Sequence, residues 1–205
     1  MRRGPGRAMQ GEVFRAILCT LGVLVLLLGP GARARAQDPP RTVESVDLGR
    51  YVGRWYELAR FPNSFQNQCV SDVTATYETR SDGRIDVINR CRTAAGEMDQ
   101  AVGVARVEDQ QSRAKLKVRF APAYLSFLPF VWGDYWVLAL DPAYRWAVVG
   151  TPDREFLWIL SRDPDLAEDQ YAAALAAARA QGFDVSRVMR TDHMTSAPAP
   201  APTVP

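Results

Sequence analysis

Few side chains in this sequence could do acid–base or nucleophilic chemistry. Its one histidine, His193, lies near the C-terminus. A serine–histidine–aspartate set needs the histidine within hydrogen-bond reach of both partners, and we expect none to form there. Glu57 is the one carboxylate that we predict on an interior strand face, although a surface or base-sealing position suits it better. We therefore predict no catalytic residue and a protein that is not an enzyme.

Cysteine is the other reactive residue type, with three copies. Cys19 lies inside an N-terminal apolar run, and Leu18 before it is not the small residue that precedes a lipidated cysteine. Cys69 and Cys91 remain as an even pair, which in an oxidising compartment favours a disulfide over two free thiols. Counting from the turn at 81–83 does not place them directly opposite, so the bond requires a β-bulge. With one histidine, we predict no metal site and no cofactor.

The first 36 residues differ in composition from the rest. They hold six arginines and one acidic residue, an apolar run over 16–28, and Ala34-Arg35-Ala36, which has the small-x-small form of a cleavage site. The run is too short for a helix across about 30 Å of hydrocarbon. We predict a secretory signal peptide over 1–36, with an uncut membrane anchor as the alternative. Without it, 25 basic and 23 acidic residues become 19 and 22, a net charge of −3, which does not suggest a nucleic-acid partner.

Short strands dominate the chain after residue 50. Turn signals such as Ser81-Asp82-Gly83 and Asp141-Pro142 separate runs of strand-like pattern. The predicted strands are 55–61, 70–79, 84–91, 98–107, 114–120, 135–140, 146–150 and 156–161. Because no helical pattern lies between them, we predict an antiparallel meander.

The pattern changes after the eighth strand. Asp163-Pro164-Asp165 places a capping residue and a proline at a helix start, and Gly182 follows an alanine-rich run. These signals predict a helix over about 165–181. We expect a last short strand over 183–188, a leader over 37–46, and a disordered tail over 191–205, which ends in alternating alanine and proline.

An eight-stranded meander has two unpaired edges, and closure into a barrel removes both. Charged residues such as Asp72 and Lys117 alternate with apolar ones such as Val73 and Leu116. This indicates an apolar interior, which is the reverse of a membrane barrel. The fold class that we predict is all-β: an eight-stranded antiparallel up-and-down β-barrel with one C-terminal helix packed outside. Such a barrel is wide enough for one small ligand.

Three short motifs occur in order along these strands. They are Gly53-x-Trp55, Asp141-x-x-Tyr144 and Arg162 at the end of Ile159-Leu160-Ser161-Arg162. With these motifs the sequence resembles the lipocalins, especially the bacterial outer-membrane lipocalins and their apolipoprotein D-like relatives. The resemblance covers about 47–190. It departs from the family at Leu140, where a threonine is usual, and in lacking a lipidation cysteine.

The resemblance implies a barrel that is closed at one end and open at the other. Trp55 is expected to plug the closed end, and Arg162 to lie over its ring in a cation–π contact worth roughly 0.5–2 kcal/mol. Gly53 allows the sharp bend that brings the indole in. These roles are structural and not catalytic.

The mouth at the other end is expected to hold four loops, over 62–68, 92–96, 121–134 and 151–154. The segment 121–132 is unusually apolar for a loop. It either folds over the barrel as a lid, or contacts the outer membrane or a second subunit.

Alternation along the strands predicts which side chains line the interior. The predicted ligand-binding residues are Val73, Ala75, Tyr77, Val87, Asn89, Tyr135, Val137, Ala139, Phe156 and Trp158. Such a lining suits an alkyl chain. By resemblance, we expect the protein to store or transport fatty acids or lysophospholipids in the bacterial cell envelope, in the periplasm or at the outer membrane. The alternatives are a lipocalin-fold enzyme acting on a lipid and a structural envelope protein without a ligand.

Overall fold

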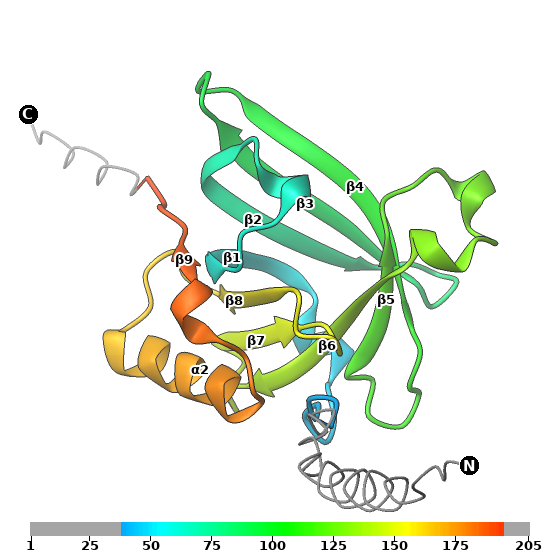
Figure 1. The fold of residues 1–205 in the computed structure, drawn as a ribbon. Helices are drawn as coiled ribbons and strands as arrows, with labels where there is room; N and C mark the ends of the chain where they lie inside the picture. The colour runs from blue at the N-terminus through cyan, green and yellow to red at the C-terminus, as the bar shows by residue number, and fades with distance from the viewer. Residues whose placement is uncertain (1–37, 195–205) are drawn as a thin grey trace, which may run out of the picture. The chain divides into compact units, whose positions relative to one another are not determined.

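The computed structural model describes residues 38–194, and Figure 1 shows their fold. The strands are β1 (Gly53–Arg60), β2 (Cys69–Thr79), β3 (Ile85–Thr93), β4 (Met98–Val107), β5 (Lys115–Arg119), β6 (Gly133–Leu140), β7 (Trp146–Gly150), β8 (Leu157–Ser161) and β9 (Met189–Arg190). Strands β1 to β8 pair in sequence order, and β1 pairs with both β2 and β8. All of these pairings are antiparallel. The predicted closed eight-stranded barrel is therefore confirmed.

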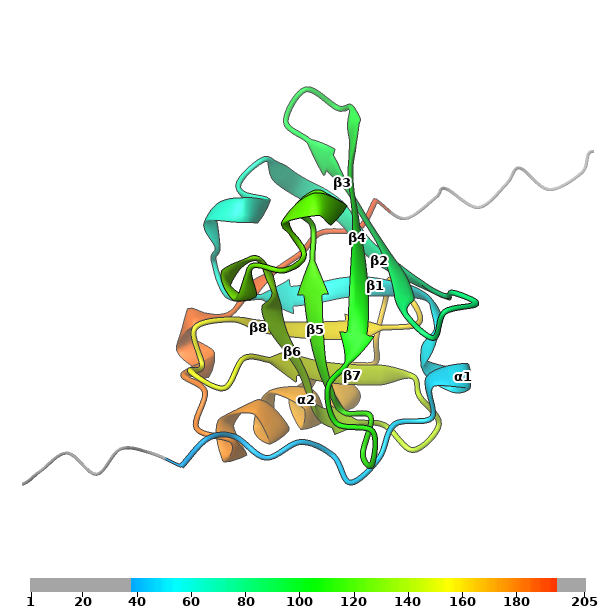
Figure 2. The ribbon, with the colours of Figure 1, turned by 90° about the vertical axis from the view of Figure 1, so that its right-hand side faces the viewer.

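Alternation along the strands separates two apolar cores. One fills the barrel interior and includes Trp55, Val87 and Val149. The other lies between the outer face of the sheet and helix α2 (Glu168–Ala180), which runs along β6 and β7 (Figure 2). Small buried residues of α2, Ala174 and Ala178, let the helix approach the sheet closely. The predicted external helix is confirmed, although it begins at Glu168.

The C-terminal part differs from the prediction. Residues 183–188 do not form a strand, because Asp184 accepts hydrogen bonds from the backbone N and hydroxyl of Ser186 and starts a short 3₁₀ turn, η4 (Val185–Arg187). The last strand is instead β9, which pairs with β1.

Residues 191–194, which were expected in a disordered tail, are hydrogen-bonded into the barrel wall. Pairing between β1 and β2 stops at Tyr56 and Thr74. Beyond that point Thr191 N donates to Leu58 O of β1, and Asp72 N of β2 donates to Asp192 O. The segment 189–194 thus fills the seam between β1 and β2, and Figure 1 shows its first part, β9, beside β1. Residues 1–36, the predicted signal peptide, and 195–205 lie outside the described residues.

A short helix that the sequence did not predict covers the closed end. Helix α1 (Leu48–Tyr51) begins at Asp47, whose carboxylate accepts from Gly49 N and Arg50 N. The hydroxyl of Tyr144 accepts a hydrogen bond from Asp47 N at 2.9 Å. The second motif therefore fixes the start of this helix.

Trp55 and Arg162 connect α1, β1 and the end of β8 at the closed end of the barrel. Trp55 is fully buried, and its Nε1 donates to Tyr51 O at 2.7 Å. The guanidinium of Arg162 lies 3.9 Å from the centre of the indole ring. Its two terminal nitrogens donate to four backbone carbonyls, those of Arg50, Tyr51, Val52 and Arg54. The predicted contact is present, and the guanidinium also satisfies the carbonyls at the end of α1.

Gly53 is the residue that makes this arrangement sterically possible. Its φ is +95°, a region that strains most other residues, and a Cβ there would lie 3.4 Å from Arg162 Nη1. Asp141 supports the same end, since its buried carboxylate accepts from the backbone and side chain of Arg145. The side-chain hydrogen bond from Arg145 lowers the pKa of Asp141.

Replacing Arg162 by alanine should destabilise the barrel by about 3 kcal/mol, because four carbonyls lose a charged donor and the cation–π contact is lost. Urea unfolding of purified protein measures this directly. Arg84→Ala is the control, because this arginine is exposed in the turn before β3 and bonds to Asp82. The urea concentration at the midpoint of unfolding should hardly change in this variant. Equal effects of the two substitutions would contradict the assigned role of Arg162.

Candidate functional site

Part of the barrel interior is open to solvent, and we call this part the cup. Cross-strand pairs turn Ala75 with Asn89 and Val149 with Trp158 toward the interior. Although they face inward, Ala75, Asn89, Trp158 and also Tyr135 keep partial solvent exposure. The interior beside these residues is therefore accessible, although Ala75 pairs in register with Trp55, whose side chain is fully buried.

Three tyrosines form the polar part of the cup floor. Tyr135 OH lies 2.8 Å from Tyr51 OH and 3.0 Å from Tyr77 OH. These rings border a small cavity of about 10 Å³, which is room for about one water molecule. Its other lining residues are apolar: Leu48, Val52, Ile85, Ala105, Leu116 and Val118. The three hydroxyls form two hydrogen bonds with one another, which use two of their three O–H groups. The third O–H can donate to a further acceptor.

Burial keeps these hydroxyls neutral. Desolvation raises the pKa of Tyr77 to about 12 and raises the pKa of Tyr51 and of Tyr135 well above the ordinary value. Neighbouring tyrosines reinforce this, since a second phenolate close by would repel the first. The floor therefore offers neutral hydroxyl groups inside an apolar wall.

Most residues predicted to line the interior lie there. Val73, Val87 and Val137 are buried, Tyr77 and Tyr135 form the floor, and Ala75, Asn89 and Trp158 line the accessible part. Phe156 precedes β8 at the rim and stacks on Trp158 with ring centres 5.9 Å apart. Phe65, in the turn η1 (Ser64–Gln66), joins this aromatic cluster.

Ala139 is the exception, because it does not line the cup. The pairing of β6 with β7 shifts register between Val137 and Ala139. This bulge turns both Leu138 and Ala139 toward the core beneath α2. Strict alternation had placed Ala139 inside, and the sequence has no glycine or proline in β6 to mark the shift beyond Gly133 at its start.

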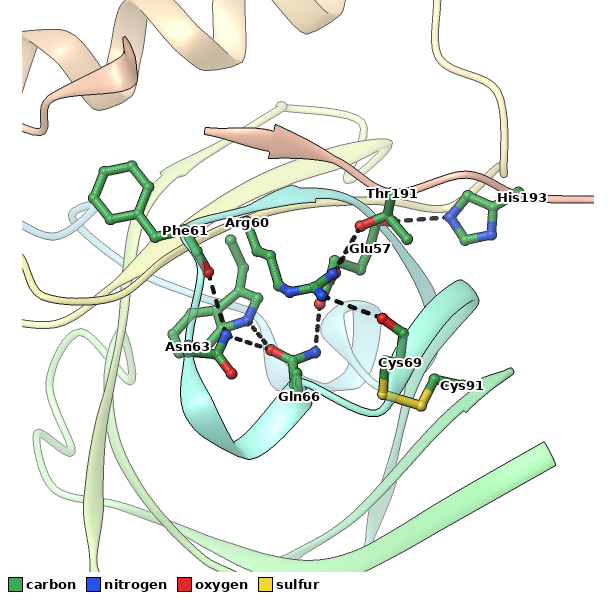
Figure 3. A network of polar contacts seen from close by, with 10 residues as sticks. Glu57, Arg60, Phe61, Asn63, Gln66, Cys69, Cys91, Thr191 and His193 are labelled. Atoms are coloured by element: carbon green, nitrogen blue, oxygen red, sulfur yellow. Dashed lines mark hydrogen bonds and ion pairs between the residues drawn. A yellow bond between two sulfur atoms is a disulfide. The ribbon is translucent and has the colours of Figure 1, made fainter. Parts of the chain in front are cut away.

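A buried ion pair that the sequence did not predict lies in the wall of the cup (Figure 3). Arg60 Nη1 donates to Glu57 Oε1 at 2.7 Å, and both residues are buried. β1 shifts register against β8 between Glu57 and Ala59, so Glu57 pairs with Leu160 and Arg60 with Trp158. Both side chains therefore face inward, and the preferred prediction of a surface or base-sealing Glu57 was wrong.

Further polar groups complete this network. Glu57 also accepts from Thr191 Oγ1 at 2.7 Å and from Gln66 Nε2 at 2.8 Å. Gln66 Oε1 in turn accepts from Asn63 Nδ2 at 2.8 Å and from Trp158 Nε1 at 3.1 Å. The network joins β1, the η1 turn, β8 and the C-terminal segment at one point of the mouth.

The predicted disulfide between Cys69 and Cys91 is present, with 5.4 Å between the Cα atoms. Cys69 pairs in register with Thr93, and β2 shifts register twice between Cys69 and Thr74. The bulge that the sequence required is therefore found. The bond ties the start of β2 to β3 beside the polar network, where Cys69 O accepts from Arg60 Nη2 at 3.5 Å.

The apolar loop 121–132 extends into solvent and does not cover the cup as a lid. Tyr124, Phe127 and Phe130 are 75–79% exposed. They lie on or between two 3₁₀ turns, η2 (Ala123–Leu125) and η3 (Pro129–Val131). Trp132 anchors the loop: it is buried, and its ring lies 4.3 Å from the guanidinium of Arg106.

Residues 38–194 contain neither a candidate metal-binding cluster nor a helix suited to crossing a membrane. No three side chains among histidine, cysteine, aspartate and glutamate gather as they would around a metal ion. Within the same range, none of the helices has the length and apolar character needed to cross a membrane.

Comparisons with known proteins match the described fold. The family model described as a lipocalin-like domain matches residues 46–193. Outer membrane lipoprotein Blc of Escherichia coli K12 is 44% identical over 153 residues, 73% of this chain and 82% of that protein. Temperature-induced lipocalin-1 of Arabidopsis thaliana is 40% identical over 158 residues, 76% and 84% of the two chains. Apolipoprotein D of Mus musculus is 30% identical over 161 residues, 75% and 80%.

Solved structures support the same fold at low sequence identity. Insecticyanin from Manduca sexta superposes with a TM-score of 0.59 at 20% identity, covering 79% of this chain and 86% of that one. Lobster apocrustacyanin A1 gives 0.58 at 18% identity, covering 78% and 93%. At this identity the likeness concerns the fold alone.

Raising the pH above about 10 should weaken the fold through the three floor tyrosines. Their hydroxyls stay protonated in the folded state at a pH where an unfolded tyrosine ionises, so their contribution to stability is full below pH 10 and is lost as pH rises. Each such group lowers the free energy of unfolding by about 1.4 kcal/mol per pH unit in that window. Urea unfolding at a series of pH values measures the slope.

Tyr51→Phe is the matched control for this titration, since it keeps the ring and removes one hydroxyl. In this variant, the slope of the unfolding free energy against pH should decrease by the contribution of one tyrosine hydroxyl. If ultraviolet absorbance of the folded protein shows that Tyr51, Tyr77 and Tyr135 ionise at the ordinary tyrosine pKa, the buried-floor description is wrong.

Proposed function

The chain belongs to the lipocalin family, and from this premise we propose that it binds one small hydrophobic ligand in its cup and stores or transports it. The ligand class is an acyl lipid, a fatty acid or a lysophospholipid. The observation on which this proposal rests most is the accessible, largely apolar half-barrel above the tyrosine floor.

Simple energetics support an alkyl chain as the occupant. Burying apolar surface contributes about 25 cal/mol per Å², and the inner faces of β2, β3, β5 and β7 offer mainly aliphatic side chains such as Val73, Val87, Val118 and Val149. The polar groups that we assign to the interior of the described residues are few: the tyrosine hydroxyls at the floor, the amide of Asn89, and the Glu57–Arg60 network near the mouth. An amphiphile with one long chain and one polar end matches this distribution.

A carrier fits this site better than an enzyme. The carboxylate of Glu57 is already bonded to Arg60, Thr191 and Gln66, which leaves it poorly placed as a free base. The ring Nε2 of His193 lies 2.8 Å from the backbone oxygen of Glu57, which occupies that nitrogen. Turnover assays on lipid esters test this part of the proposal, and multiple turnovers per chain would contradict it.

The proposed location is the cell envelope. Residues 1–36 have the composition of a secretory signal peptide, and a disulfide such as Cys69–Cys91 persists in an oxidising compartment. Relatives 44% identical to this chain are named outer membrane lipoproteins. A periplasmic protein that works at or near the outer membrane combines these three observations.

The loop 121–132 is the proposed contact with that membrane. Its exposed aromatic side chains project from the mouth end, and interfacial aromatic residues favour the headgroup level of a bilayer. The cation–π contacts of Arg106 and Arg119 with Trp132 hold the base of the loop. A membrane-facing mouth would shorten the path of a lipid into the cup.

Filling the cup should weaken ligand binding without unfolding the protein. Ala75→Trp adds a large ring on the accessible inner face, and we expect at least about a tenfold loss of affinity for palmitate in calorimetric titration. Ala173→Trp makes the same change on the exposed face of α2 and should leave the affinity unchanged. Unaltered binding by both variants would place the ligand outside the cup.

The membrane contact makes a separate prediction. Phe127→Ser with Phe130→Ser should reduce sedimentation of the protein with vesicles of phosphatidylethanolamine and phosphatidylglycerol by about tenfold, because two exposed rings no longer insert. Val70→Ser removes an exposed apolar side chain elsewhere at the mouth and should have little effect. If the double variant binds vesicles normally but no longer forms a dimer in size-exclusion chromatography, the loop is a subunit interface instead.

A further inference from the structure

One nitrogen of the buried network has an unused hydrogen bond. The Arg60 side chain is 6% exposed and faces the cup opposite Trp158. Its Nη1 donates to Glu57 and Thr191, and its Nη2 to Cys69 O, whereas Nε has no partner in the described residues. A buried guanidinium N–H is costly to leave without an acceptor. This donor therefore has capacity for an oxygen that the protein itself does not supply.

Gln66 already shows where such an oxygen would be held. Its amide oxygen accepts hydrogen bonds from two N–H donors, Asn63 Nδ2 and Trp158 Nε1. Its amide nitrogen bonds to Glu57 next to Arg60, and Figure 3 shows the three side chains close together. Gln66 comes from the η1 turn in a mouth loop and is only partly buried. It can therefore leave by a side-chain rotation, after which these donors are available to another acceptor.

The balance of donors and acceptors defines the chemistry of that acceptor. Arg60 Nε, Asn63 Nδ2 and Trp158 Nε1 are all donors, so the cluster suits a group with several acceptor oxygens. When Gln66 leaves, Glu57 Oε1 keeps its bonds to Arg60 and Thr191, whereas Glu57 Oε2 loses the Gln66 donor and can accept an O–H of a protonated head group. The Glu57–Arg60 pair has no net charge. A carboxylate or a phosphate meets these conditions, and charged acceptors make the stronger hydrogen bonds.

Resting on the proposed function, we propose that Arg60, Asn63 and Trp158 form the head-group site of the cup and bind the carboxylate or phosphate oxygens of an amphiphile in place of Gln66. The aromatic rim of Phe65 and Phe156 lies beside this site, so the start of the alkyl chain contacts apolar rings. The rest of the chain extends toward the tyrosine floor.

Tryptophan fluorescence titration of the delipidated full-length chain tests the site with three ligands of equal chain length: tetradecanoate, tetradecyl phosphate and tetradecanol. We expect at least one anion to bind about tenfold more tightly than the alcohol. The tighter anion identifies a carboxylate or a phosphate head group as the natural one. Equal affinity for all three would overturn the head-group site and leave ligand binding in the cup intact.

Two variants test whether the preference for anionic ligands over the alcohol arises at this site. Glu57→Gln with Arg60→Gln replaces both charged groups by neutral amides and leaves no unpaired buried charge; it should bring the anion-to-alcohol ratio to within about twofold while retaining alcohol binding. Gln66→Ala removes the competing amide and should tighten anion binding only. Gln68→Ala, an exposed glutamine two residues away that bonds to Asp99, is the matched control and should change nothing.

The outcomes separate the two proposals. An unchanged ratio in the double variant and in Gln66→Ala would show that the network is only structural. If the double variant does not fold, the wild-type ratio and Gln66→Ala still decide the matter. No binding of any of the three ligands by the wild-type chain would overturn the proposed function and the head-group site together.

Discussion

The guanidinium of Arg162 is the constraint on which the barrel depends. It bonds to four successive or near-successive carbonyls between Arg50 and Arg54 while it covers the ring of Trp55. One side chain thus fixes the end of α1, the start of β1 and the end of β8. These contacts hold the closed end of the barrel together, while part of the interior stays open to solvent as the cup.

Register shifts in three strands determine which side chains lie at the mouth and along the wall of the barrel. A register shift in β1 turns Arg60 inward beside Glu57, and one in β6 turns Ala139 outward beneath α2. Near the disulfide β2 shifts as well and parts from β1, and the C-terminal segment enters the seam. Thr191 of that segment reaches the carboxylate of Glu57. The seam, the disulfide and the polar network are therefore parts of one structure, built where the regular ladder ends.

The sequence predicts the regular strands of this protein well, and it predicts the bulges and the C-terminal segment poorly. Period-two alternation identified the strands and most of the lining, and the three spaced motifs identified the closed end correctly. Bulges carry no local signal when neither glycine nor proline marks them, as at Ala59 and Ala139, so alternation assigned Ala139 to the wrong face and gave no sign that Arg60 faces inward beside Glu57. The ordered segment 191–194 was missed because its partners, Leu58 and Asp72, lie more than 100 residues away in the sequence.

The central claim is that the cup of the folded protein holds a single acyl lipid. Native mass spectrometry of protein purified gently from cells, without detergent or delipidation, tests this most directly. The account predicts one added mass per chain that matches a fatty acid or a lysophospholipid and that is lost on denaturation. A spectrum of the bare chain alone, unchanged after incubation with palmitate and with a lysophospholipid, would contradict it.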